Sequence, residues 1–99
     1  MAGFVQIIDF TTSRYEEGDK LVDEYRAKTK GKSTFLRAMT LRDRDTPNHY
    51  LQVVEFPSYE DAMKNSELPE TAALAEALAA LSDGPQSFGN FDIVRVVEG

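Results

Sequence analysis

The chain of 99 residues contains no cysteine, no tryptophan and a single histidine, His49. Without cysteine it can form neither disulfides nor thiolate intermediates, and zinc sites built on cysteine are excluded. One histidine with scattered carboxylates does not make a spaced set of metal ligands, so we expect no metal and no other cofactor. Apart from His49, the chain therefore offers few obviously reactive side chains.

Long apolar runs are also missing. No segment approaches the roughly 20 apolar residues of a membrane helix, and the start of the chain, MAGFVQIIDF, lacks the basic residues and cleavage site of a signal peptide. We therefore expect a cytoplasmic protein with no membrane association. The length suits one domain covering residues 1–99. A net charge of −6 disfavours nucleic acid as a partner.

Basic residues are unevenly distributed. They are concentrated between Arg26 and Arg44, whereas Lys64 and Arg95 are the only ones beyond residue 45. This segment is either a solvated loop and strand edge or a basic entrance that attracts an anionic small ligand.

Hydrophobic periodicity predicts four strands and two helical regions. The expected strands cover residues 4–10, 34–42, 49–56 and 91–97. The expected helices cover residues 14–29 and 58–81, and the second is broken near Leu68-Pro69 because proline is not tolerated inside a helix. The order β-α-β-β-α-β predicts the α+β, ferredoxin-like fold with a four-stranded antiparallel sheet.

Local signals place the helix ends. Ser13 followed by Glu16 is a capping-box pattern at the start of the first helix. Ser58 followed by Asp61 indicates an N-cap for the second helical region. At the end of that region Gly84 is suited to a left-handed cap.

The strands do not alternate cleanly between apolar and polar residues. In the first strand Ile8 and Phe10 alternate with Val5 and Ile7, so both sides of the strand are apolar. A single ferredoxin-like domain covers one face of its sheet with helices and exposes the other to water. We therefore predict a homodimer in which the second face packs against the sheet of another copy.

At this point the chain resembles the dimeric α+β barrel superfamily, and within it the small antibiotic-biosynthesis-monooxygenase-like proteins. Three segments carry the resemblance: RYEEGDKLVDEYRAK, TFLRAMTLRDRDTPNHYLQVVEF and SYEDAMKNSELPE. The resemblance covers nearly the whole chain. It implies a small-molecule pocket between the sheet and the helices.

The resemblance also implies a range of activities. Some members oxidise polycyclic phenols with molecular oxygen and no cofactor, others bind or degrade haem, and others are lactone isomerases or have no known activity. Haem-degrading relatives carry an axial histidine on the second long helix, and the matching stretch ETAALAEALAAL has none. A tryptophan that is frequent at the end of the third strand is replaced here by Phe56-Pro57.

Three residues are candidate catalytic groups: His49, Asp9 and Arg37. The ordinary pKa of histidine would let His49 take a proton from a phenol near neutral pH. A single histidine at the start of a strand is also typical of a surface or rim residue, and if Tyr50 and Gln52 face the helices, His49 must face the other way. Arg37 could hold a phenolate or carboxylate, and Asp9 is the alternative base.

A second group are candidate ligand-binding residues. Gln6 and Gln52 interrupt apolar strands, and a buried polar group needs a partner. Asn65 lies at the polar break of the second helical region and could orient a ligand carbonyl, although helix termination explains it equally well. The remaining candidates are aromatic or apolar residues for which core packing is the alternative: Tyr25, Tyr50, Phe56 and Met63.

The leading hypothesis is a homodimeric, cofactor-independent monooxygenase that acts on a small aromatic or polyketide-like molecule. The alternative is a non-catalytic dimer that binds a small hydrophobic ligand or acts in a stress response. Haem binding is the third hypothesis.

Overall fold

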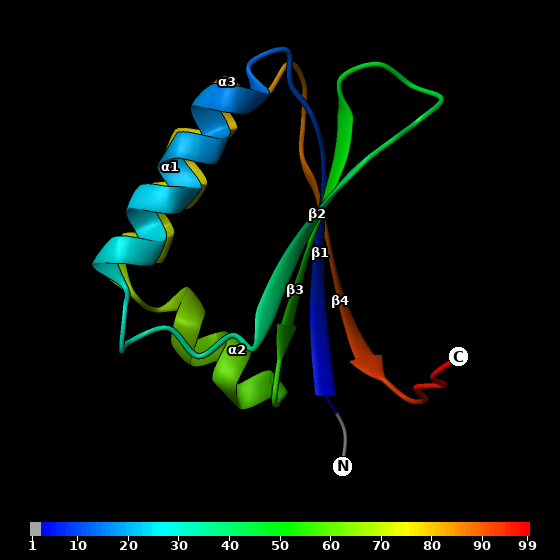
Figure 1. Cartoon of the computed structure of the whole chain (residues 1–99). Helices are drawn as coiled ribbons and strands as arrows, with labels where there is room; N and C mark the ends of the chain where they lie inside the picture. Colours follow the sequence, from blue (N-terminus) through cyan, green and yellow to red (C-terminus); the bar gives the residue numbers. More distant parts are fainter. Residues whose placement is uncertain (1–2) are drawn as a thin grey trace.

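The computed structural model describes residues 3–99, in which four strands and three helices are formed (Figure 1). In chain order these are β1 (Gly3–Thr11), α1 (Tyr15–Lys28), β2 (Arg37–Arg42), β3 (His49–Phe56), α2 (Tyr59–Ser66), α3 (Pro69–Leu81) and β4 (Ser87–Ile93). The strands form one antiparallel sheet in the order β2-β3-β1-β4. The predicted α+β, ferredoxin-like fold is confirmed, with the second helical region divided into α2 and α3.

All three helices lie over one face of the sheet, and the opposite face is open (Figure 1). The strand register decides which side chains share a face, because they alternate along each strand. Phe4 pairs with Phe56 and Ile8 pairs with Gln52, so the even-numbered residues of β1 and β3 face the helices. The odd-numbered residues face away.

The open face is largely apolar. It carries Val5, Ile7, Met39, Leu41, Leu51, Val53, Phe91 and Ile93. Met39 is 38% exposed, Leu41 44% and Phe91 52%, so no element within residues 3–99 covers them fully. The prediction that both sheet faces are apolar is confirmed, and the open face has the composition of a buried one.

The buried core lies at the end of the sheet that α2 covers. Phe4 of β1, Phe56 of β3 and Ala62 of α2 are each at most 3% exposed, and Met63 packs against them. The rings of Phe4 and Phe56 lie 6.4 Å apart, between centroids. The other end of the sheet, beneath α1 and α3, is less completely filled.

Two sequence signals around α2 are confirmed. The Oγ of Ser58 accepts a hydrogen bond from the backbone N–H of Asp61 at 3.1 Å, as an N-cap does. The helix ends at Ser66, and Pro69 opens α3 in the first turn, where its missing N–H costs nothing.

The start of α1 differs from the predicted capping box. Its N-cap residue is Arg14, and no side chain caps the helix. Thr12 Oγ1 instead accepts from the N–H of Arg14 at 3.0 Å and donates to the carbonyl of Leu81 at 2.7 Å. The N–H of Ser13 donates to Asp83 Oδ2 at 2.7 Å. The prediction is wrong because this segment binds the end of α3 rather than its own helix.

The last strand lies earlier in the chain than predicted. It covers Ser87–Ile93 rather than 91–97, and its last residue pairs with Gly3, where β1 begins. The sequence did not indicate its first half because glycine is rare in strands. A Cβ at Gly89 would lie 2.5 Å from the ring of Phe91, so only glycine leaves room for that ring.

The second strand and the end of α3 also differ from the prediction. The second strand begins at Arg37 rather than at 34, because the N–H of Thr34 donates to Asn65 Oδ1 at 3.3 Å and so binds α2. Helix α3 ends at an extended Ser82, whose Oγ donates to the carbonyl of Leu78. Gly84 therefore does not form the predicted left-handed cap.

Candidate functional site

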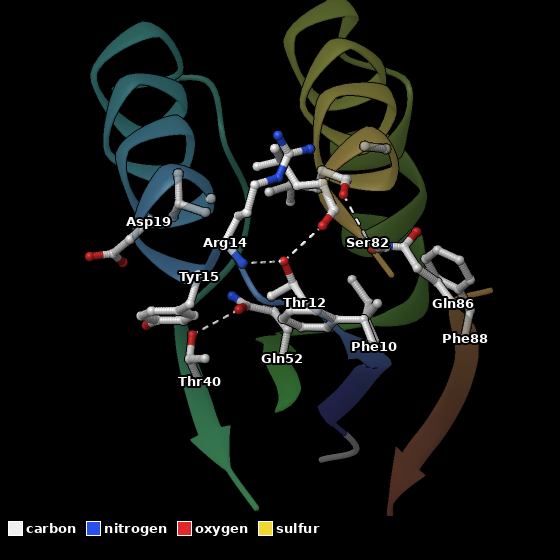
Figure 2. Close-up of a pocket in the computed structure, with 16 residues that line it drawn as sticks. Phe10, Thr12, Arg14, Tyr15, Asp19, Thr40, Gln52, Ser82, Gln86 and Phe88 are labelled. Atoms are coloured by element: carbon white, nitrogen blue, oxygen red, sulfur yellow. Dashed lines mark hydrogen bonds between the residues drawn. The ribbon is translucent and has the colours of Figure 1, made fainter. Parts of the chain in front are cut away.

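A partly open cavity of about 100 Å³ lies between the sheet and the α1–α3 pair (Figure 2). Ile8, Phe10, Thr40, Gln52 and Phe88 line it from the sheet, and Tyr15, Val22, Leu78 and Leu81 line it from the helices. The lining is mainly apolar with a few polar groups, which is the usual composition of a small-molecule site. This cavity is the candidate functional site.

A stack of three aromatic rings borders the cavity, and its two outer rings, Phe10 and Tyr15, belong to the lining. Tyr50 of β3 lies between Phe10 of β1 and Tyr15 of α1. Its centroid is 5.7 Å from that of Phe10, with planes 19° apart, and 4.7 Å from that of Tyr15, with planes 16° apart. A flat aromatic ligand would find a parallel, preformed surface here.

Gln52 places an amide in the middle of the helix-facing side of the sheet. Thr40 on the neighbouring strand donates a hydrogen bond from Oγ1 to Gln52 Oε1 at 2.8 Å. Figure 2 shows both side chains within the cavity lining, with the Gln52 oxygen turned to Thr40. Tyr50 and Gln52 face the helices, which is the orientation under which His49 faces the other way.

The described lining has few ionisable groups. It includes Asp19, Arg14 and Tyr15 but no histidine, lysine or cysteine. Arg14 donates to the carbonyl of Ala80 at 3.2 Å and pairs with Glu17 at 3.5 Å. Figure 2 shows the Asp19 carboxylate turned away from the other labelled side chains. The cavity therefore contains no strong base directed at its centre.

The single histidine of the chain lies on the open face. His49 Nε2 is 2.7 Å from Asp9 Oδ1, and His49 Nδ1 is 2.7 Å from Asp43 Oδ2. A neutral imidazole has one N–H, so both hydrogen bonds form together only when His49 is protonated. The bond to Asp43, and then the bond to Asp9, raises the pKa of His49 above its ordinary value near 6.5. The bond to His49 is the main cause that lowers the pKa of Asp43.

The β2–β3 connection holds Asp43 in position for this contact. Asp43 Oδ1 accepts from the N–H groups of Asp45 at 2.8 Å and Thr46 at 3.2 Å. Asn48, just before β3, has a positive φ of 65° and its carbonyl accepts from the N–H of Thr12. The sequence indicated this turn by its Pro-Asn pair but not the role of Asp43.

Arg37, the third candidate catalytic residue, is not part of either cluster. It forms an ion pair with Glu55, its cross-strand neighbour on the open face. His49 is at the other end of β3, roughly 20 Å away at about 3.3 Å per residue. Asp9 and His49 are thus brought together, and Arg37 is not.

The remaining candidate residues lie mostly near α2. Asn65 Nδ2 donates to Tyr25 Oη at 3.2 Å, and that hydroxyl shares a hydrogen bond with Thr71 at 2.8 Å. Both Asn65 and Tyr25 are buried, and Phe56 and Met63 belong to the core described above. The network therefore joins the three helices, and none of these residues lines the cavity.

Gln6 has its own partner across the sheet. Its Nε2 donates to Asn90 Oδ1 at 3.2 Å on the neighbouring strand β4, at an exposed position. It does not line the cavity.

A second hollow, of about 410 Å³, lies between α1 and α3 and is lined by Tyr25, Leu74 and Glu70, among others. It is larger but more open than the cavity over the sheet, and its edge carries the Lys32–Glu70 ion pair. Ligand sites are usually concave and enclosed. The cavity over the sheet is therefore the better candidate.

Several lining residues were not among the predicted site residues. Thr40 and Phe88 belong to strands whose register is not readable from the sequence, and Phe88 lies in a segment predicted to be a loop. Tyr15, Leu78 and Leu81 read as ordinary helix residues. One signal in the sequence could have found some of them. Gln52 lies on the same face of the sheet as its cross-strand neighbours Ile8 and Thr40, and all three line the cavity.

Within residues 3–99 no three His, Asp or Glu side chains are grouped so that they could hold a metal ion. None of the described helices is long and apolar enough to cross a membrane.

Comparison with solved structures shows the same fold in several proteins. SnoaB, a cofactor-independent oxygenase from Streptomyces nogalater, has a TM-score of 0.82 and 21% identity over 98% of each chain. An antibiotic biosynthesis monooxygenase has a TM-score of 0.72 and 16% identity over 93% of this chain and 99% of its own. A conserved protein from Methanosarcina mazei Go1 has a TM-score of 0.79 at 9% identity over 92% of each chain.

No protein-family model matches the sequence, and no curated protein matches it either. At these identities the structural likeness establishes the fold. The chain therefore has the fold of the antibiotic-biosynthesis-monooxygenase-like structures, as its sequence predicts.

Proposed function

We propose that this protein is a homodimeric, cofactor-independent monooxygenase that binds a small aromatic or polyketide-like molecule between its helices and its sheet. The observation that carries the proposal is the apolar cavity with its aromatic stack and central Gln52 amide. The fold shared with SnoaB, a cofactor-independent oxygenase, supports the reaction type. We place its activity in the cytoplasm.

The proposed reaction needs an electron-rich substrate rather than a cofactor. Loss of a proton from an anthrone-like phenol gives a carbanion, which adds molecular oxygen to form a hydroperoxide. The hydroperoxide loses water and leaves a ketone, so one CH₂ and one O₂ become one C=O and one H₂O. The protein contributes by accepting the proton and by stabilising the anion with fixed dipoles.

The candidate catalytic groups are His49 or Asp9 as the base and Arg37 or Asn65 as the stabiliser of the anion. His49 and Asp9 are hydrogen-bonded to each other, but they belong to the face of β1 and β3 opposite the cavity. If His49 or Asp9 removes the substrate's proton, it must therefore do so at the rim of the sheet. Substitution of His49 by alanine tests the role of the base. Substitution of Arg37 by alanine tests the stabilisation of the anion.

The open face supports the homodimer. Its apolar side chains extend across all four strands, half-buried on β1 and β3 and exposed on β2 and at Phe91 of β4, which is unusual for a surface in contact with water. A second copy presents the same surface and can cover it symmetrically. Stable interfaces of this kind bury about 800 Å² on each partner.

Oxygen consumption tests the activity. The purified protein is incubated with a panel of anthrones and hydroquinones, and oxygen uptake is compared with the rate in buffer. We expect uptake above the buffer rate for at least one substrate, and loss of that uptake in His49→Ala and Arg37→Ala. Rates that never exceed the buffer rate would contradict the monooxygenase proposal.

A second function, binding without catalysis, is favoured by one observation: the described lining of the cavity contains no histidine, lysine or cysteine. In that case substitutions of His49 and Arg37 change affinity at most and no turnover is seen. Haem binding is disfavoured because the described lining of the cavity contains no histidine, cysteine or methionine to ligate the iron. A haem titration without an ordered Soret shift would exclude it.

A further inference from the structure

Gln52 is a polar residue in apolar surroundings. On the helix-facing side of the sheet its cross-strand neighbours are Ile8 and Thr40, and along its own strand the flanking positions are Tyr50 and Val54. An amide in such a position is destabilising unless its hydrogen-bonding groups are satisfied. The partners of this one side chain therefore decide what the cavity can hold.

Only one half of the amide has a partner within the described chain. Oε1 accepts the hydrogen bond from Thr40 at 2.8 Å. No residue between 3 and 99 accepts from Nε2, which carries two N–H donors. Thr40 thereby fixes the rotation of the amide and leaves the donors to water or to a ligand.

The neighbouring glutamine on the same face is different. The Nε2 of Gln6 donates to Asn90 Oδ1 at 3.2 Å, so its donors have a protein partner. Gln6 lies outside the cavity lining, whereas Gln52 lies within it. The free amide donors thus coincide with the cavity.

The size of the cavity limits the part of a ligand that can enter. A cavity of about 150 Å³ holds one benzene molecule, and this one measures about 100 Å³. The enclosed part therefore holds only part of an aromatic ring, and the rest of the ligand must extend through the open side. Phe10 and Tyr15 line the cavity and provide aromatic surface for that ring.

We propose that Gln52, held by Thr40, determines the ligand specificity of the cavity by donating from Nε2 to the oxygen of a phenolate or of a carbonyl group bonded to an aromatic ring. The ligands it selects are aryl ketones and phenolates, whose oxygen is an acceptor in the plane of the ring. A hydrocarbon of the same shape leaves the donors unpaired and binds less well. The inference rests on the proposed function, because it names the chemical class that the same cavity accepts.

A matched pair of probes tests the proposal. 1-Indanone and indane have the same fused ring system and differ by the carbonyl oxygen. Their dissociation constants are measured by titration of the intact protein, followed by NMR or calorimetry. Because the oxygen of 1-indanone can accept from Nε2 and indane has no acceptor, we expect 1-indanone to bind roughly tenfold more tightly than indane.

Three variants make the test specific. Gln52→Leu should remove the preference by weakening 1-indanone roughly tenfold while leaving indane unchanged. Thr40→Val keeps the amide but frees its rotation, so it should reduce the preference only in part. Gln6→Leu is the control and should retain the full preference, since its amide is already paired.

The outcomes separate this inference from the proposed function. If both probes bind the wild type equally, or if Gln52→Leu keeps the preference, the inference is overturned while the cavity remains a site for aromatic ligands. If neither probe binds, the proposed function is contradicted and the inference with it. Thermal unfolding of Gln52→Leu checks that the variant keeps the fold.

Discussion

His49 and Gln52 lie on the same strand, yet the alternation of side chains places them on opposite faces of the sheet. His49 is held between two carboxylates on the open face. Gln52 offers free donors to the cavity on the other face. The candidate base and the proposed recognition residue are therefore separated by the thickness of one sheet, and their roles can be tested independently.

The pKa of His49 gives a direct prediction. Its hydrogen bonds to Asp43 and Asp9 favour the protonated form, so the imidazole should titrate above 6.5. As the chain has one histidine, its imidazole signal in an NMR titration needs no assignment. Asp43→Asn should lower this pKa, whereas Asp45→Asn, at an exposed position without contact to His49, should not. A value at or below 6.5 that Asp43→Asn leaves unchanged would contradict the geometry.

The same pair makes stability depend on pH. The pKa of His49 is raised in the folded state, so its contribution is fully present below about 6.5 and is lost as the pH rises through the folded-state value. The pKa of Asp43 is lowered, so its contribution is present above its ordinary value of 3.8 and is lost as the pH falls. The pair should therefore stabilise the protein most between roughly pH 4 and 6.5.

At the scale of secondary structure, the signals that depend on neighbouring residues predicted the structure well. The Ser58 cap and the break before Pro69 are both present, because each depends only on residues within a turn. The capping box at Ser13 and the position of β4 were mispredicted. In both cases a distant segment decides the outcome: the end of α3 binds Ser13, and β1 selects the residues of β4.

Ser58 and Ser13 allow a matched test, because the cap predicted at Ser58 forms and the capping box predicted at Ser13 does not. Ser58→Ala removes a side-chain cap and should lower the free energy of unfolding by about 1 kcal/mol. The side chain of Ser13 caps nothing, since it is the backbone N–H of Ser13 that contacts Asp83. Ser13→Ala should therefore change the free energy of unfolding by less than about 0.5 kcal/mol. Urea unfolding of both variants measures the two values. An equal loss in both would mean that the predicted capping box does form.

The candidate site, like the secondary structure, was predictable only where it depends on residues close together in the sequence. Strand alternation indicated that Tyr50 and Gln52 share one face and His49 lies on the other, but not which of the two faces meets the helices. It could not indicate that Thr40 lies beside Gln52 or that Phe88 lies beside Ile8, because register is set by tertiary pairing. The His49–Asp43 contact was missed for the same reason, as it depends on the conformation of the β2–β3 connection.

At the scale of the whole molecule, the open face of the sheet should be an interface between two copies. Val53 lies near its centre, paired with Ile7 and Met39. Val53→Lys places an unpaired charge in that interface, which typically costs about 2–5 kcal/mol and raises the dimer Kd roughly 30-fold or more. Ala79→Lys, at an exposed position of α3, is the control and should leave the dimer unchanged.

Analytical ultracentrifugation over a range of concentrations measures this equilibrium. The proposal predicts a dimer for the wild type and for Ala79→Lys, and monomers for Val53→Lys. A wild type that remains monomeric at high concentration would contradict the proposed interface.

The central claim is that a small aromatic molecule binds between the helices and the sheet, and an NMR titration with 1-indanone tests it most directly. In ¹H–¹⁵N spectra of the labelled protein, the claim predicts shifts at the backbone amides of Gly18 and Phe88 and at the side-chain amide of Gln52, which line the cavity. The amides of Met39 and Phe91 on the open face should not move. Shifts confined to the open face, or no shifts at all, would contradict the account.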